Sequence, residues 1–440
     1  MKDWQEEYRS KIITPDEAAA MVKSGDRVTF TMGREAHTLG LALAVRKEEL
    51  KGVKVFTPAA GYDFGWYDPG WEDSFEITTS IGTALIQPML DERRCDFNPT
   101  GLIPQEDCEN LWDADVVFTE VSLPDDKGFC SFGLSLWNKR RHIEIAKLVI
   151  AEVNDKLIRT HGDNYVHISE IDYFVMHEPS GIPLGTGSLT GKEVKEPEPY
   201  LKDIASNVAK LVRDRDTLQI GVGRTTEPLA ALGILDDKKD LGYHSETTPP
   251  GIISLVRKGV ITGKYKGLHP GKVVVTSVGG GSRQEIEWVN NNPIFLLVDV
   301  AYLEDVGIIA KHDNFVAINN ALQTDLTGQI AAETLGNRMI SLAGGQIPFA
   351  IGARFSKGGR FITVLPSTAL GGSVSRIVPQ LEPGTVVTIQ RNLTDYVVTE
   401  YGIAHLRGKS VRNRAQALID IAHPKFRDEL EKAARKLFWP

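Results

Sequence analysis

A short pattern that recurs 190 residues later in the chain (216 − 26) constrains the fold more than any other feature of the sequence. Residues 26–34 (DRVTFTMGR) and 216–224 (DTLQIGVGR) each contain a polar turn, a short apolar strand and a glycine-bearing turn, and a helical pattern follows both. The same offset pairs residues 52–61 with 242–251, which places Phe56 opposite Glu246. The repeat predicts two related domains, although two unrelated βα units also give such a pattern.

Short apolar segments alternate with helical patterns along the rest of the chain. Such alternation is typical of an α/β fold with mostly parallel sheets, because parallel strands are joined by long crossovers that usually contain a helix. We expect two related α/β domains, residues 1–185 and 201–440, with a Pro- and Gly-rich linker at 186–200 and the active site at their interface. The expected strands include 53–57, 114–121, 148–153, 273–277, 294–300, 361–365, 384–388 and 395–399, and the expected helices include 204–213 and 411–421.

The composition excludes several classes of protein. Lys and Arg number 50 and Asp and Glu 58, so the net charge of −8 argues against a nucleic-acid partner. The N-terminal sequence MKDWQEEYRS lacks the apolar run of a secretory signal, and no stretch reaches the roughly 18 apolar residues of a membrane span. Cys95, Cys108 and Cys130 form no C-x-x-C pair, which argues against a zinc site and a disulfide framework. We expect a cytoplasmic protein with reduced thiols and no membrane partner.

Two glycine-rich segments and one acidic residue are candidates for chemistry. Gly221 and Gly223 lie in a turn that follows a strand and is expected to open a helix, which suits an anion. Glu246 lies in the loop 242–251 (GYHSETTPPG) at an expected strand end, where open α/β sheets bind ligands, although a solvated loop glutamate is the alternative. Gly344 and Gly345 can bring backbone N–H groups close to a ligand oxygen. The aromatic loop 61–67 (GYDFGWY) is either a pocket wall or a packed loop.

Many separate motifs, in the same order, resemble the acetyl-CoA hydrolase/transferase family. The run DYVVTEYGIAHLRGK at 395–409 and the later AHPKFR at 422–427 are the strongest. Within this family of glutamate-dependent class I CoA-transferases, the chain is most similar to the 4-hydroxybutyrate CoA-transferases. The match extends from about residue 10 to 435, and its further motifs lie at 121–131, 149–154, 159–163, 319–329, 356–359, 366–368 and 375–379.

The resemblance implies roles for particular residues. The catalytic glutamate of the family ends an H-[TS]-E segment, which falls on His244, Ser245 and Glu246. The resemblance also implies two related domains, acyl-CoA and a small carboxylic acid as substrates, no required metal, and a homodimer or higher homo-oligomer. The residues expected at the oxyanion and CoA site are Asn319, Gly344, Gly345, Gln346, Gly221, Gly223 and Arg224, and those expected in the substrate pocket are Gly33, Arg34, Tyr62, Thr248, Pro249 and Pro348.

The chain departs from the family pattern beside the expected acyl site. The family usually continues the glutamate segment with an aromatic residue, Ser, Asp and Gly, whereas this chain has TPPG at 248–251. The usual acidic residue after G-G-Q-x is Pro348 here, and the glycine-rich turn of the first half reads TMGREAH at 31–37. These departures favour an unusual acyl group.

The expected activity is CoA transfer between an acyl-CoA and a free acid through a covalent glutamyl-CoA thioester on Glu246. Two alternatives remain. An acyl-CoA hydrolase would use the same glutamate with water as the acceptor, and a regulatory protein would bind acyl-CoA without catalysis.

Overall fold

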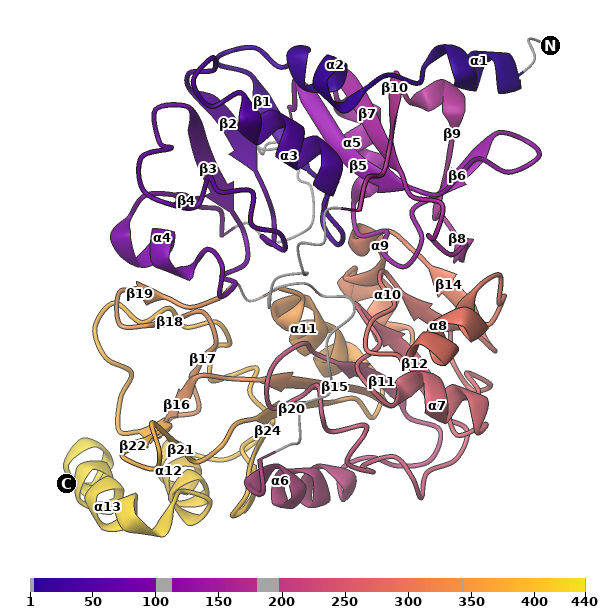
Figure 1. The fold of residues 1–440 in the computed structure, drawn as a ribbon. Coiled ribbons are helices and arrows are strands. Elements are labelled where there is room, and N and C mark those ends of the chain that lie inside the picture. Colours follow the sequence, from indigo (N-terminus) through magenta and orange to yellow (C-terminus); the bar gives the residue numbers. More distant parts are fainter. Residues whose placement is uncertain (1–3, 100–112, 180–197, 342–343, 440) are drawn as a thin grey trace. The chain divides into compact units, whose positions relative to one another are not determined.

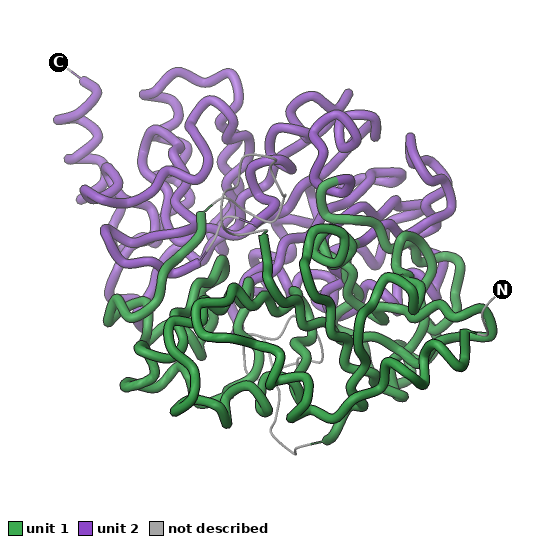
Figure 2. Tube along the Cα trace, turned by 90° about the horizontal axis from the view of Figure 1, so that it is seen from above, with its two compact units in different colours: residues 1–192, 276–301 green, residues 193–275, 302–440 purple. Residues whose placement is uncertain are grey.

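The computed structural model describes residues 4–99, 113–179, 198–341 and 344–439. These residues form two compact units (Figure 2). Unit 1 contains residues 1–192 and 276–301, and unit 2 contains residues 193–275 and 302–440. The segment 276–301 belongs to unit 1, although its place in the sequence predicted that it lies in the second domain. Of the expected linker at 186–200, residues 186–197 lie outside the described part of the chain, and Tyr200 already begins a helix.

Unit 1 is built on a parallel sheet with the strand order β10-β7-β5-β1-β2-β3-β4 (Figure 1). Its central strands are β1 (Arg27–Phe30) and β5 (Val116–Val121). Strand β5 is buried at every position, as is usual for a parallel strand covered on both faces. The other elements are α1 (Trp4–Ser10), α2 (Pro15–Ala20), α3 (His37–Val45), β2 (Val53–Phe56), β3 (Phe75–Thr79), α4 (Gln87–Glu92), β4 (Asp96–Phe97), β6 (Phe129–Ser131), α5 (Lys139–Ile145), β7 (Leu148–Val153), β8 (His161–Gly162), β9 (Tyr165–His167), the 3-10 helix η1 (Ile168–Glu170), β10 (Tyr173–Met176), α8 (Arg283–Val289) and β14 (Phe295–Leu297).

The core of unit 1 contains the aromatic loop 61–67. The ring of Phe30 on β1 lies 5.7 Å from that of Phe64 and 5.6 Å from that of Trp66. Tyr62, Phe64, Trp66 and Tyr67 are at most 5% exposed. The loop is therefore part of the hydrophobic core, because buried aromatic rings gain most by packing against one another, and its role as a pocket wall stays a prediction.

Unit 2 contains strands in the order β25-β24-β20-β15-β11-β12-β13, all parallel except the last hairpin β24–β25. Helix α11 packs on β15 and β20, and α6 packs on β24. The elements are α6 (Tyr200–Ala209), β11 (Thr217–Ile220), β12 (Gly242–Ser245), α7 (Ile252–Arg257), β13 (Val273–Val275), α10 (Val306–Ala310), β15 (Phe315–Asn320), β16 (Gln323–Asp325), β17 (Ile330–Ala331), β18 (Thr334–Leu335), β19 (Arg338–Met339), α11 (Gln346–Phe355), β20 (Arg360–Val364), β21 (Thr368–Ala369), β22 (Val374–Ser375), β23 (Ile377–Val378), β24 (Tyr396–Thr399), β25 (Gly402–His405), α12 (Val411–Asp420) and α13 (Pro424–Phe438). Helix α9 (Val300–Leu303) spans the sequence boundary between the units.

Three expected elements differ from the structure. Residues 384–388 form no strand, and the helix expected at 204–213 is α6, which begins four residues earlier and ends at Ala209. The chain after Gly223 forms consecutive turns instead of a regular helix. Pro228 contributes to this irregularity because it has no N–H to donate. The turn at Gly221 and Gly223 therefore lacks the helix N-terminus that suggested an anion site.

The two sheets share one topology. Strand β1 lies between β2 and β5, and β11 lies between β12 and β15 in the same chain order. The register differs, because Arg27 pairs with Lys54 (54 − 27 = 27), whereas Thr217 pairs with Gly242 (242 − 217 = 25). The sequence offset between corresponding residues of the two units is therefore 190 at β1 and β11 but 188 at β2 and β12 (242 − 54). By strand pairing the counterpart of Glu246 is residue 58, and the gap-free alignment with Phe56 is corrected.

Unit 2 contains a buried ion pair that generates a stability prediction. Arg360 pairs with Asp216, and their side chains are 6% and 1% exposed. Replacing Arg360→Met leaves a buried carboxylate without its partner, so the free energy of unfolding falls by about 3–5 kcal/mol. The double variant with Asp216→Leu recovers much of this loss. Urea unfolding measures both effects. Arg283→Met is the control, because its ion pair with Glu287 is exposed (94% and 61%) and its loss changes the stability little. If Arg360→Met is as stable as the wild type, the prediction is wrong.

Candidate active site

Glu246 follows the last residue of β12 directly and is only 9% exposed, so the alternative of a solvated loop glutamate is wrong. Its Oε1 accepts a hydrogen bond from the backbone N–H of Gly345, with 3.3 Å between N and O. Its carboxyl group is also hydrogen-bonded to the carboxyl group of Glu304. Burial raises the pKa of Glu246, and these two hydrogen bonds oppose the rise.

Glu304 is the second carboxyl group of the site, one residue beyond α9, and no sequence motif pointed to it. It is 3% exposed, and burial together with the neighbouring Glu246 raises its pKa well above the ordinary value. Two buried carboxyl groups in contact do not both carry a charge, so the pair holds one proton. Glu246 receives the Gly345 N–H, whereas Oε1 of Glu304 has no hydrogen-bond partner among the described residues. The proton therefore resides on Glu304 and the charge on Glu246.

His244 connects these two carboxyl groups through the backbone. Alternate side chains of a strand point to the same face, so His244 and Glu246 project to one side of β12. The Nε2 of the buried His244 ring lies 2.8 Å from the backbone oxygen of Leu303, the residue before Glu304. Burial lowers the pKa of His244 well below its ordinary value, so the ring is neutral and donates its N–H to this carbonyl.

Glycine is favoured at 344 by the backbone conformation and required at 345 by the space beside the carboxyl pair. Gly344 has a φ of +54°, which favours glycine. A Cβ at Gly345 would lie 2.7 Å from Oε1 of Glu304 and 2.8 Å from the ring of Phe349. A side chain at 345 is therefore excluded, and the N–H of this residue reaches Glu246 at the start of α11.

Asn319 and Gln346 occupy the neighbouring strand end and helix start. Asn319 on β15 exchanges two hydrogen bonds with Gln219, at 2.9 and 3.1 Å, so its amide is oriented by the adjacent strand. A Cβ at Gly221 would collide with the Asn319 amide. Gln346 donates from Nε2 to the backbone oxygen of Asn320, at 3.3 Å. The role of Asn319 as an oxyanion donor stays a prediction.

The remaining predicted residues of unit 2 lie in three places. Gly223 has a positive φ of 149° in the turn after β11, and Arg224 beside it is exposed. Thr248 and Pro249 are buried just after β12. Pro348 is the third residue of α11, where its missing N–H removes one donor from the first turn of the helix. None of these positions by itself identifies a pocket.

The predicted pocket residues of unit 1 are held by contacts within that unit. The Nε of Arg34 lies 3.0 Å from Oε2 of Glu120, and the Arg34 side chain is 28% exposed. The backbone N–H of Tyr62 donates to Oε2 of Glu35 at 2.9 Å. Gly33 has a φ of +110°, and a Cβ there would collide with Ser135. Their role in substrate binding stays a prediction.

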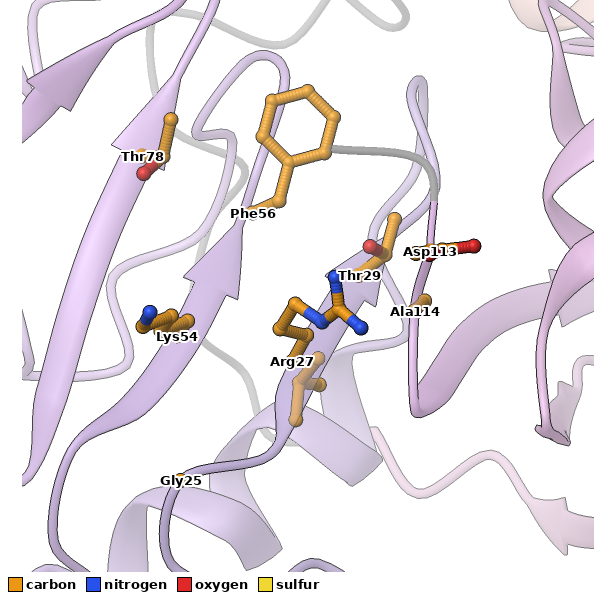
Figure 3. A pocket seen from close by; sticks show the side chains of 9 residues that line it. Gly25, Arg27, Thr29, Lys54, Phe56, Thr78, Asp113 and Ala114 are labelled. Atoms are coloured by element: carbon orange, nitrogen blue, oxygen red, sulfur yellow. The ribbon is translucent and has the colours of Figure 1, made fainter. Parts of the chain in front are cut away.

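A cavity of about 240 Å³ lies on one face of the unit 1 sheet (Figure 3). Arg27 and Thr29 on β1 and Lys54 and Phe56 on β2 line it, as expected from the alternation of side chains along a strand. It contains none of the predicted site residues. Within the described ranges there is no group of three or more His, Cys, Asp or Glu side chains suited to a metal ion, and no helix among them is long and apolar enough to cross a membrane.

The hydrogen bond from His244 generates a second prediction. His244→Phe keeps a buried ring but leaves the carbonyl of Leu303 without its donor, so the free energy of unfolding falls by about 1–3 kcal/mol. The backbone that carries Glu304 loosens, and turnover falls as well. Urea unfolding and a CoA-transfer assay measure the two effects. His312→Phe is the matched control, because its buried ring nitrogens have no partner among the described residues. Equal effects of both variants would contradict this role.

The sequence matches two domains of one family. Residues 1–184 match the acetyl-CoA hydrolase/transferase N-terminal domain, and residues 281–434 match the C-terminal domain. The chain is 40% identical to the 4-hydroxybutyrate coenzyme A transferase of Clostridium kluyveri, over 99% of the chain and 100% of that protein. It is 37% identical to the succinyl-CoA:cyclohexane-1-carboxylate CoA transferase of Geobacter metallireducens, over 99% of the chain and 98% of that protein.

Solved structures have the same fold over the full length. RipA from Yersinia pestis superposes with a TM-score of 0.89, at 32% identity and 100% coverage of both chains. The 4-hydroxybutyrate CoA-transferase of Porphyromonas gingivalis gives a TM-score of 0.79, at 34% identity over 99% of this chain and 100% of that one. These findings confirm the α/β fold with mostly parallel sheets and the resemblance found in the sequence. The chain therefore belongs to the acetyl-CoA hydrolase/transferase family and is a CoA-transferase.

Proposed function

We propose that the chain moves CoA between an acyl-CoA and a free carboxylic acid, with Glu246 as the covalent carrier of CoA. The observation that carries this proposal is the buried Glu246 carboxylate at the end of β12, which receives the Gly345 N–H. A charged carboxylate with so little water around it is a stronger nucleophile than one in solution.

The proposed reaction exchanges one thioester for another. The Glu246 carboxylate attacks the thioester carbonyl, which gives a mixed anhydride and CoA thiolate. The thiolate then attacks the Glu246 carbonyl and releases the first acid as a carboxylate, leaving a glutamyl-CoA thioester. A second carboxylate reverses these two steps and leaves as the new acyl-CoA. The energies of the two thioesters are similar, so the exchange needs no ATP, and one difficult transfer is divided into easier ones.

Gly345 has a specific role in this sequence. In the later steps the attacked carbon is that of Glu246, so negative charge develops on the oxygens of this side chain. The Gly345 N–H already contacts Oε1 in the free enzyme. Such a donor stabilises the tetrahedral intermediate, and the loss of one costs roughly 3–4 kcal/mol in barrier height. The amide of Asn319 and the backbone N–H of Gly344 are further candidates.

The first test concerns the covalent carrier. Incubation with acyl-CoA without an acceptor, followed by borohydride, reduces a glutamyl thioester and places the label on Glu246. Glu246→Ala lowers transfer by at least about 10³-fold, because no other covalent route remains. Peptide mass spectrometry locates the reduced residue. Full activity of Glu246→Ala, or a label elsewhere, would falsify the assignment.

Acyl-CoA hydrolysis is the nearest alternative. The chain is 30% identical to the acetyl-CoA hydrolase of Candida albicans over 28% of the chain. A hydrolase needs water at the glutamyl thioester, and the low exposure of Glu246 favours transfer over hydrolysis. Thioester loss measured with and without an acceptor acid separates the two activities. Binding of acyl-CoA without turnover would support the regulatory alternative.

The choice of acid gives a further prediction. Pro249, Pro250 and Pro348 replace polar or acidic residues of the family pattern, and proline supplies no backbone donor. A pocket without a polar partner penalises a buried hydroxyl, so kcat/KM for 4-hydroxybutyrate falls roughly tenfold below that for butyrate or a bulkier apolar acid. Pro348→Asp narrows this difference. Assays with one acyl-CoA donor decide it, and a preference for 4-hydroxybutyrate over butyrate in the wild-type enzyme rules it out.

We also propose a cytoplasmic homodimer or higher homo-oligomer. Cys95 and Cys130 are free thiols, and burial raises the pKa of Cys95 to about 11 and that of Cys130 to about 12. Such thiols resist oxidation and are compatible with a reducing compartment. Cys108 lies outside the described residues. Light scattering of the purified protein determines the oligomeric state.

A further inference from the structure

We propose that Glu304 is a positioning residue of the CoA-transfer reaction, which keeps one proton throughout the cycle and donates it in a hydrogen bond to Glu246. The proposal rests on Glu246 being the nucleophile. It adds a second donor to the Gly345 N–H on the same carboxyl group, and it assigns a role to a residue that no motif identified.

Three segments of the fold bring together the residues that this role requires. Strand β12 supplies Glu246, the end of α9 supplies Glu304, and the turn before α11 supplies Gly345. The carboxyl groups of Glu246 and Glu304 are hydrogen-bonded, and a Cβ at Gly345 would lie 2.7 Å from Oε1 of Glu304. Glu304 therefore lies against both the nucleophile and the oxyanion donor.

The tyrosine and histidine side chains around the pair are neutral at neutral pH. Tyr243 precedes His244 on β12, its hydroxyl donates to the backbone oxygen of Thr247, and burial raises its pKa above the ordinary value. His244 is neutral and bound to the backbone of Leu303. Behind it, His312 is 5.0 Å from the His244 ring, and burial lowers its pKa to about 3.

His269 also lies close enough to influence His244, and Lys266 is a further titratable group on this side of β12. Its Nζ donates to the backbone oxygen of Tyr243 at 2.8 Å, and burial lowers its pKa to about 7. Its hydrogen bonds are to backbone carbonyls, at Tyr243 and Lys272, and not to either carboxyl group. The proton between Glu246 and Glu304 is therefore not supplied or neutralised by an ion pair.

A protonated Glu304 helps at two points of the cycle. In the free enzyme it fixes the Glu246 carboxylate without adding a second negative charge. Once Glu246 is an anhydride or a thioester, the same O–H faces a neutral acyl group, whose oxygen becomes negative when a nucleophile adds. No proton leaves Glu304 in this scheme, so the reaction balances as written for the proposed function.

The direction in which turnover changes with pH follows from the proton that Glu246 and Glu304 share. Raising the pH through the pKa of the shared proton removes it and places two negative charges side by side. The donor is then lost and Glu246 is displaced by repulsion, so turnover falls on the alkaline side. In Glu304→Gln the amide donates a hydrogen bond and does not titrate in this range.

The test compares Glu304→Gln and Glu304→Ala with wild type across neutral and alkaline pH. Glu304→Gln retains activity within about threefold at neutral pH and lacks the alkaline fall. Glu304→Ala loses roughly 10- to 100-fold in kcat with a smaller change in KM for acyl-CoA, since a donor to a charged group is lost. Glu333→Gln, in a buried glutamate of unit 2 that accepts from the Thr388 hydroxyl, is the control and keeps the wild-type profile. An unchanged alkaline fall in Glu304→Gln, or full activity of Glu304→Ala, overturns the proposal.

A spectroscopic measurement needs no turnover. Infrared difference spectra recorded against pH with ¹³C-labelled glutamate show, in the wild-type enzyme and not in Glu304→Gln, a protonated buried carboxyl that disappears at alkaline pH. Absence of this band at neutral pH contradicts the proposal. If borohydride labels another residue while the band is present, the proposed nucleophile is wrong but the proton-sharing pair remains. If Glu246 is labelled and the band is absent, only the role of Glu304 fails.

Discussion

The position of the nucleophile depends on how the end of β12 is tied to its neighbours. His244 binds the backbone at Leu303, and the hydroxyl of Ser245 donates to the backbone oxygen of Ile220 on β11, at 3.1 Å. Successive residues thus anchor the strand on its two faces, and Glu246 is the next residue. A side chain at the end of such a strand has few conformations left, which is the condition for a carboxylate to meet its donor without reorganisation.

The local sequence pattern was sufficient to predict most strands of the two parallel sheets, because buried parallel strands are short runs of apolar residues. The expected segments 53–57 and 148–153 coincide with β2 and β7 to within one residue. The segment 384–388 shows the limit of this reasoning. Its β-branched residues indicate extended backbone, but Val386 and Val387 are 41% and 37% exposed and form no strand. Composition identifies extended chain, whereas only tertiary structure provides a pairing partner.

The candidate site likewise contains residues that the sequence identifies and one that only the fold reveals. Glu246 and Gly345 were found because the motifs that contain them are contiguous in the sequence. Glu304 lies 58 residues after Glu246 (304 − 246), in a segment whose own pattern is an ordinary helix end. Its importance comes from a contact across the fold, which spacing does not encode. The register of β12 is a similar case, because strand pairing and not the sequence offset determines which residues of the two halves correspond.

The crowding at Gly345 has a consequence for how this sequence can change over time. Glu304 and the ring of Phe349 each approach within 3 Å of where a side chain would begin. Shortening the acid at 304 removes only one of these obstacles, so the glycine is still required until Phe349 is also replaced. The three positions therefore form one evolutionary unit, in which drift at one is restricted by the other two. Across related sequences, residues 304, 345 and 349 should covary, and a lineage that loses the acid should retain the glycine for longer.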